Sequence, residues 1–141
     1  MIIAYRTPAG SGSYTTLANE TTQPLADAIS QYQIDLTKSP QTATGYGATI
    51  PVTLDLGNAR WSLGFTVDRV HASPDAALLF TNTHMLALGE AANFDLQITV
   101  GSQVLYLAAC CLTKLTPAPH SDQSTQFKYT FTGGQYQTTA P

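Results

Sequence analysis

The sequence has 141 residues, the length of one domain, and its hydrophobic fraction of 43% is that of a folded protein. The net charge of −3 and the scattered positions of the six lysines and arginines argue against a dedicated nucleic-acid binder. No run of 18 apolar residues is present, which argues against a membrane-spanning helix. Charged residues make up only 11% of the chain, against about 25% in an average domain, and this indicates a surface that packs against copies of itself.

The first third of the chain alternates between short apolar runs and polar segments. Residues 1–6 predict a short strand or anchor, and they lack the positive region and long apolar core of a signal peptide. Residues 7–24 and 38–49 are rich in Thr, Gly, Ser and Pro, which is typical of loops or arms. We expect both segments to be mobile in an isolated subunit and ordered on assembly, with Leu17 and Tyr46 as apolar anchors.

Residues 25–36 fit two patterns. Leu25, Ile29, Tyr32 and Leu36 have helical spacing, whereas the stretch from Tyr32 to Leu36 also alternates as in a strand. We favour a strand over 30–37.

The central third contains two predicted strands. Apolar residues alternate over 50–56, where Pro51 indicates an edge or a strand start, and again over 61–71. A turn at 57–59 then predicts that these two strands form an antiparallel pair.

A helix is predicted over about 74–88. Ser73 supplies the N-cap, Pro74 suits the first helical position, and Asp75 places an acid in the first turn. Gly89 is expected to end the helix.

Two strands over 93–100 and 103–115 are predicted to follow, joined by a tight turn at Gly101 and Ser102. The stretch 104–112 is apolar at every position, which predicts a central strand covered on both faces. Residues 116–124 are expected to form a proline-punctuated loop.

The C-terminal part alternates at Phe127, Tyr129 and Phe131, which predicts a last strand that ends at Gly133 and Gly134. Residues 135–141 are expected to be a mobile tail. We expect residues 1–141 to form a single β-domain. The predicted fold class is mainly β, an antiparallel β-sandwich or barrel with one flanking helix at about 74–88.

No residue pattern indicates a catalytic, cofactor or metal site. His71, His84 and His120 have no cysteine or acid at zinc-ligand spacing. The adjacent cysteines, Cys110 and Cys111, would form only a strained disulfide, and we interpret them as small apolar residues of a chain made in a reducing compartment.

Other short motifs also carry no chemistry. The glycine pairs Gly10/Gly12 and Gly45/Gly47 match neither the dinucleotide fingerprint nor the phosphate loop. The glycosylation sequon at Asn19 is interpreted as a chance match. We therefore expect no enzymatic activity, no catalytic residue, no cofactor and no metal.

The order of elements from 61 to 134 resembles small tail proteins of bacteriophages and prophages, which include tail-tube subunits and ring-forming proteins at tail ends. The segments that carry this resemblance are 71–77, 84–86, 94–98, 115–117 and 124–134. It implies a virion structural protein that is assembled in the bacterial host cytoplasm and binds copies of itself and other tail proteins. It further implies a ring closed through strand edges, a hexamer if the likeness to tail tubes holds. We expect Thr130 to lie near an exposed strand edge that takes part in this assembly.

Two other classes of function remain open. A carbohydrate-binding β-sandwich would use exposed aromatic residues such as Tyr46 and Trp61. A small β-barrel enzyme would use His71 or His84 together with an acid brought close by folding.

Overall fold

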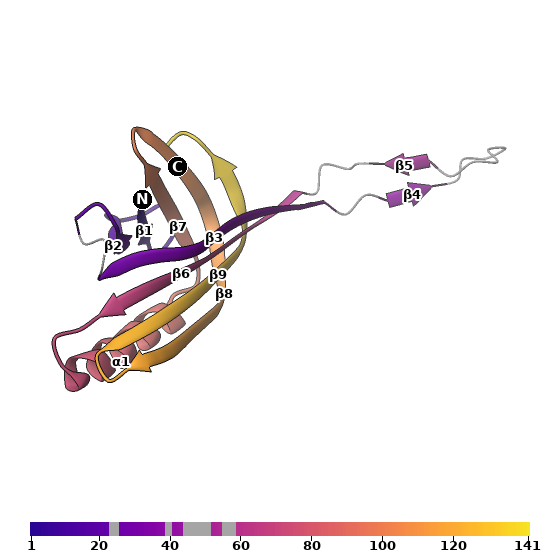
Figure 1. Cartoon of the computed structure of the whole chain (residues 1–141). Helices are drawn as coiled ribbons and strands as arrows, with labels where there is room; N and C mark the ends of the chain where they lie inside the picture. Colours follow the sequence, from indigo (N-terminus) through magenta and orange to yellow (C-terminus); the bar gives the residue numbers. More distant parts are fainter. Residues whose placement is uncertain (23–25, 39–40, 44–51, 55–58) are drawn as a thin grey trace.

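The computed structural model describes residues 1–22, 26–38, 41–43, 52–54 and 59–141, and within these ranges it is a curled antiparallel sheet with one helix (Figure 1). Seven strands form the sheet in the order β2-β1-β7-β8-β9-β6-β3. Their bounds are β1 Ile2–Arg6, β2 Thr15–Asn19, β3 Asp27–Lys38, β6 Ala59–Val70, β7 Phe94–Val100, β8 Gln103–Ser121 and β9 Ser124–Gln137. The sheet curls into a half-barrel, so the predicted fold class is confirmed.

Two further strands form a small separate sheet. β4 (Gln41–Ala43) pairs with β5 (Val52–Leu54), and Figure 1 shows both beyond the far ends of β3 and β6. The prediction that residues 50–56 pair with the next strand is therefore wrong, because β6 pairs with β3 and β9. The turn predicted at 57–59 lies outside the described residues except for Ala59, which belongs to β6.

Alternating side chains build the core on the concave face of the sheet. Phe65, Phe131 and Tyr129 stack with ring centroids 4.8 to 6.4 Å apart, and Phe94 meets Phe131 edge to face at 5.5 Å. The other fully buried apolar residues of this core are Ile3, Leu17, Ala18, Leu63, Val67, Leu96, Cys110 and Phe127. The period-2 pattern in the sequence is thus explained by burial of one face.

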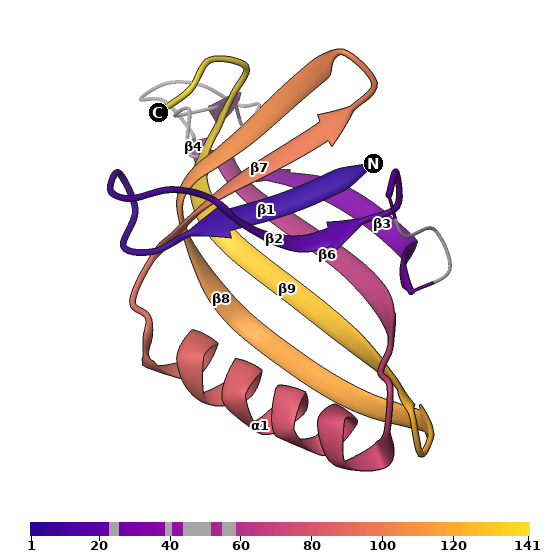
Figure 2. The ribbon, with the colours of Figure 1, turned by 90° about the vertical axis from the view of Figure 1, so that its left-hand side faces the viewer.

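The helix α1 (Pro74–Glu90) crosses the concave side near the end of the β8–β9 hairpin (Figure 2). The Oγ of Ser73 accepts a hydrogen bond from the Ala76 N–H at 3.1 Å, which confirms the predicted N-cap. Gly89 does not end the helix, because it lies in the last helical turn and Ala91 is the C-cap. No helix among the described residues is long and apolar enough to cross a membrane.

Several segments expected as loops contain strand. β2 lies within 7–24 and pairs with β1, and the ambiguous segment 25–36 contributes to β3, as favoured. The loop predicted at 116–124 is wrong, because β8 continues to Ser121 opposite β9. The pairing of β8 with β7 ends at Cys110, so the later part of β8 pairs with β9 on one side only. Pro117 and Pro119 are tolerated there because their missing N–H groups are not needed on the free side.

Two further predictions, about the burial of β8 and the position of Thr130, are wrong. β8 is central, but only one of its faces is buried along 109–111: Cys110 is fully buried, whereas Ala109 and Cys111 are exposed. Thr130 lies in β9, between β8 and β6, and is therefore not at a sheet edge. The outer strands of the sheet are β2 and β3.

The glycine pair in β9 bends the strand without ending it. Gly133 and Gly134 have φ angles of 81° and 76°, and β9 continues beside β8 to Gln137. Pairing with β6 stops at Thr132, so β9 and β6 separate beyond this point. A Cβ at Gly134 would lie 2.4 Å from the Ala108 carbonyl oxygen, whereas a Cβ at Gly133 has nothing within 4 Å.

We predict that Gly134→Ala destabilises the protein more than Gly133→Ala does. Both variants force a methyl-bearing residue to positive φ, which costs about 1–2 kcal/mol, but only Gly134→Ala adds a backbone clash worth roughly 1–3 kcal/mol more. Free energies of unfolding from urea titration measure the difference. Equal losses in the two variants would contradict the close approach to Ala108.

Candidate functional site

The first candidate surface is the gap between the outer strands of the half-barrel. At one end of the gap the Arg69 guanidinium donates to the Leu17 carbonyl, which joins β6 to β2. The Glu20 carboxylate accepts a hydrogen bond from the Ile29 N–H at 2.7 Å and lies 3.7 Å from the N-terminal ammonium. Side chains thus close this end of the gap in place of a strand ladder.

The second half of β3 has a free edge. Ile29 directs its N–H away from β6, and successive residues of a strand direct their backbone groups to opposite sides. One bulge between Ser30 and Gln33 shifts the register, so Ile34 and Leu36 again direct their backbone groups away from β6. No strand of the described residues pairs with them, and another strand can add there.

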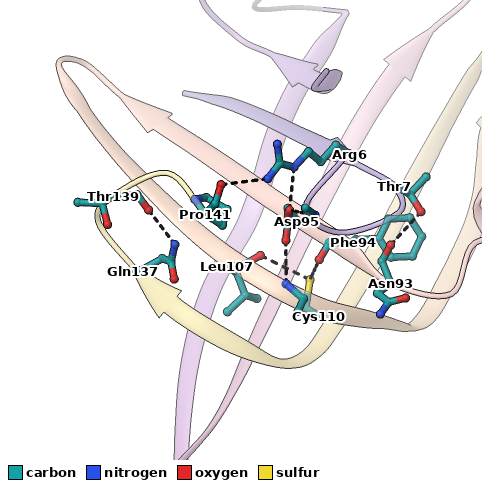
Figure 3. Close-up of polar contacts among 12 residues, drawn as sticks. Arg6, Thr7, Asn93, Phe94, Asp95, Leu107, Cys110, Gln137, Thr139 and Pro141 are labelled. Carbon is teal, nitrogen blue, oxygen red and sulfur yellow. Dashed lines mark hydrogen bonds and ion pairs between the residues drawn. The ribbon is translucent and has the colours of Figure 1, made fainter. Parts of the chain in front are cut away.

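A buried carboxylate holds the N-terminal loop against the sheet. Asp95 is only 1% exposed and accepts three hydrogen bonds, from the Arg6 Nε at 2.7 Å, the Gly10 N–H at 2.6 Å and the Ala109 N–H at 2.8 Å. Arg6 also donates to the Pro141 carbonyl at 3.3 Å (Figure 3). Residues far apart in the sequence therefore meet at one side chain.

The charges in this cluster stabilise each other. Burial raises the pKa of Asp95, but the hydrogen bonds from Ala109, Gly10 and Arg6 together outweigh burial and leave the pKa below its usual value. The hydrogen bond to Asp95 raises the pKa of Arg6, whose guanidinium lies 5.0 Å from the centroid of the Tyr14 ring. Gly10, with φ of 81°, supplies its N–H to a carboxylate of the chain itself.

His84 belongs to the packing between α1 and the sheet. Its Nε2 lies 2.7 Å from the Tyr129 hydroxyl, and its ring contacts Phe80 and Phe127 with centroids 5.1 and 5.4 Å away. Burial, followed by the positive charge of Arg69, lowers the pKa of His84 to about 4. The imidazole is therefore neutral near pH 7.

His71 and His84 are the histidines whose side chains the structure describes, and both take part in packing. His71 packs on Phe80 at 5.1 Å, with its pKa lowered by burial, and no acid hydrogen-bonds to His71 or His84 in the part of the chain that is described. The side chain of His120 lies outside the described residues. Within the described ranges no group of three His, Cys, Asp or Glu residues could hold a metal ion.

The remaining candidates have structural roles where they are described. Cys110 and Cys111 are both free, and burial raises the pKa of the Cys110 thiol to about 12, which leaves that sulfur protonated. Trp61 stacks on Tyr136 at 4.6 Å, so one face of its indole ring is covered. The Asn19 side chain accepts hydrogen bonds from the Thr21 and Thr22 N–H groups in a local turn.

Tyr46, Gly45 and Gly47 lie outside the described residues. No sequence pattern predicted the cluster around Asp95. In the sequence this cluster is visible only as an acid between the apolar residues Phe94 and Leu96. The alternating pattern of a strand predicts that such a position faces solvent, whereas Asp95 is buried.

The comparisons with known proteins support the fold. Neither a protein-family model nor a curated protein matches the sequence. A chain in the tail of an empty gene transfer agent (GTA) particle, computed with helical refinement in C6 symmetry, matches with a TM-score of 0.55 and 16% identity over 99% of this chain and 95% of that chain. A chain in the virion of a native GTA particle matches with a TM-score of 0.53 and 13% identity, over 98% and 95% of the two chains. The structural neighbours are thus tail and virion structures, as the sequence resemblance implied.

We predict that Asp95→Asn lowers Tm by more than about 5 °C at neutral pH, because it removes the buried charge opposite Arg6 and turns an amide donor toward backbone donors. Asp35→Asn, the same change at an exposed site, should shift Tm by no more than about 1 °C. Since the pKa of Asp95 is lowered on folding, its contribution is present above about pH 4 and is lost at lower pH. Thermal scans at pH 7 and pH 3 should show the gap between variant and wild type narrowing in acid; a constant gap would count against the ionised cluster.

We also predict that stability falls as the pH drops from about 6.5 to 4. The unfolded chain binds a proton at His84 in this window, whereas the folded chain does not, so the contribution is fully present above about pH 6.5. His84→Gln, which keeps a group that can hydrogen-bond to Tyr129, should show a smaller decline in Tm between pH 7 and pH 4.5. His71, whose pKa is also lowered, accounts for part of the decline that remains. Identical pH profiles for wild type and variant would contradict the assignment to His84.

Proposed function

We propose that this chain is a structural subunit of a phage-like tail. The observation that carries the proposal is the free edge of β3 on a half-barrel that otherwise has a complete core. The match of nearly the whole chain to subunits of tail and virion particles agrees with it. Other tail proteins are then its partners, and the virion is its location.

The finer proposal is a closed ring of copies joined through strand edges. The sheet has two different outer strands, β2 and β3, and contacts between two different surfaces close into a ring when the rotation allows. We infer six copies, because the matched tail has C6 symmetry. We infer no enzymatic activity, since the described histidines are used in packing.

The proposal is tested by the mass of the protein in solution and by an edge variant. Ile34→Pro removes an N–H that points to the free edge and leaves the pairing with β6 intact, so it should shift the protein from rings toward monomers. Ile34→Val trims the same side chain, keeps the N–H and should still form rings. Native mass spectrometry and negative-stain images of the two variants provide the measurement.

A wild-type protein that stays monomeric at high concentration and near-physiological salt would refute the ring. In that case the carbohydrate-binding alternative would gain, although Trp61 would have to leave Tyr136 to expose its ring fully.

A further inference from the structure

A second long backbone edge lies along the later part of β8. The pairing of β8 with β7 ends at Cys110, whereas its pairing with β9 continues to Ser121. In the part of the chain that is described, the stretch after Cys110 therefore has a partner strand on one side only. An exposed strand edge of this kind is a template for pairing with another chain.

The helix α1 lies beside this edge without sealing it. Figure 2 shows α1 running alongside the later part of β8. A groove of about 260 Å³ separates them, and its lining includes Ala77, Leu78 and Thr81 of α1 together with Pro117 and Pro119 of β8. At the two prolines the edge therefore borders a groove instead of packed side chains.

The backbone groups of the two prolines point away from β9. Successive residues of an antiparallel strand direct their N–H and C=O groups to opposite sides. Gln123, just before β9, accepts a hydrogen bond at its carbonyl from the His71 N–H on the side of β6. Every second residue from there, including Phe127 opposite Pro117, directs its backbone groups toward β6 as well. Pro117 and Pro119 therefore occupy positions whose backbone groups face the free side of β8.

Proline changes what this edge offers to a neighbouring strand. Because proline has no N–H, the edge presents carbonyl acceptors at 117 and 119 but no donors. A strand that paired there would leave two of its own carbonyl groups without a partner, and unpaired buried acceptors make such pairing unfavourable. The free edge of β3 differs, since Ile34 and Leu36 carry both a donor and an acceptor.

We propose that Pro117 and Pro119 block strand addition in the groove between α1 and β8 and so confine self-assembly to the outer strands of the sheet, an inference that rests on the proposed assembly through strand edges. Proline in a sheet is found at edges, where it discourages pairing with other chains. The two prolines thus determine which edge of the chain a neighbouring copy can use.

Restoring the two N–H groups tests the proposal. The variant Pro117→Thr/Pro119→Thr adds donors on the groove side, and threonine suits a strand without adding a large apolar surface. Light scattering should detect species larger than the wild-type assembly at concentrations at least about tenfold below those at which wild type forms them. Either single replacement should give a smaller gain of the same sign. Circular dichroism confirms that each variant is folded.

Ala118→Thr is the matched control. It places the same side chain on the same strand, but the N–H of residue 118 faces β9 and not the groove. The concentrations at which this variant associates should stay within about threefold of those of wild type.

Two further measurements identify the edge that pairs. Adding both threonines to Ile34→Pro should restore association, because the new contact uses β8 and not β3. In the associated species of the double threonine variant, amide hydrogen exchange at 117 and 119 should be at least about tenfold slower than in its monomer.

The outcomes separate this block from the proposed assembly. A monomeric wild type refutes the assembly, whereas association of the double threonine variant would still support the block on β8. A double threonine variant with the same mass distribution as wild type refutes the block. Equal association of Ala118→Thr and the double variant would overturn it too, because the gain would then not depend on the restored N–H groups.

Discussion

The structure depends on a sheet that curls without closing. A closed barrel pairs the backbone groups of every strand, but here the outer strands β2 and β3 meet at one end only, where Glu20 accepts from Ile29 of β3 and Arg69 joins β6 to β2. The helix α1 covers the concave side instead of an eighth strand. The core is therefore complete, with its stacked aromatic rings fully buried, while one edge of the sheet stays available.

This arrangement separates the residues that stabilise the chain from those that are available for the proposed contacts. The buried rings, the carboxylate of Asp95 and the packing of His84 all lie within one chain, so none of these contacts needs a neighbouring chain. The backbone edge of β3 and the exposed leucines of α1 contribute little to that core, although the side chain of Ile34 packs against it. A subunit of this kind can fold first and assemble afterwards, and mutations on the two sets of residues should have separable effects on stability and on association.

The sequence predicted local structure well and long-range pairing poorly. Alternation reveals a buried face whatever the neighbouring strand is, and the N-cap at Ser73 is read within one helical turn, so strands and helix were found. Pairing of β5 with β4 rather than β6 depends on contacts between distant segments, which no local pattern encodes. Pro117 and Pro119 suggested a loop. They are tolerated in β8 because this stretch no longer pairs with β7, and that loss of pairing is a property of the fold which the local sequence does not show. The cluster at Asp95 joins residues 85 and more positions apart in the chain and could not be inferred from spacing.

The small number of charged residues limits how this chain can associate with other proteins. Of the six lysines and arginines, Arg6 and Arg69 are used inside the subunit, on Asp95 and at the gap between β2 and β3. Few cations are left for the surface, so long-range attraction can contribute little to association, and apolar area and backbone edges must supply most of the proposed binding energy. Under that condition the charges that remain act chiefly on the orientation of the proposed contacts, since electrostatic complementarity governs orientation more than strength. A surface with few charges thus agrees with the proposed assembly of copies in a fixed orientation.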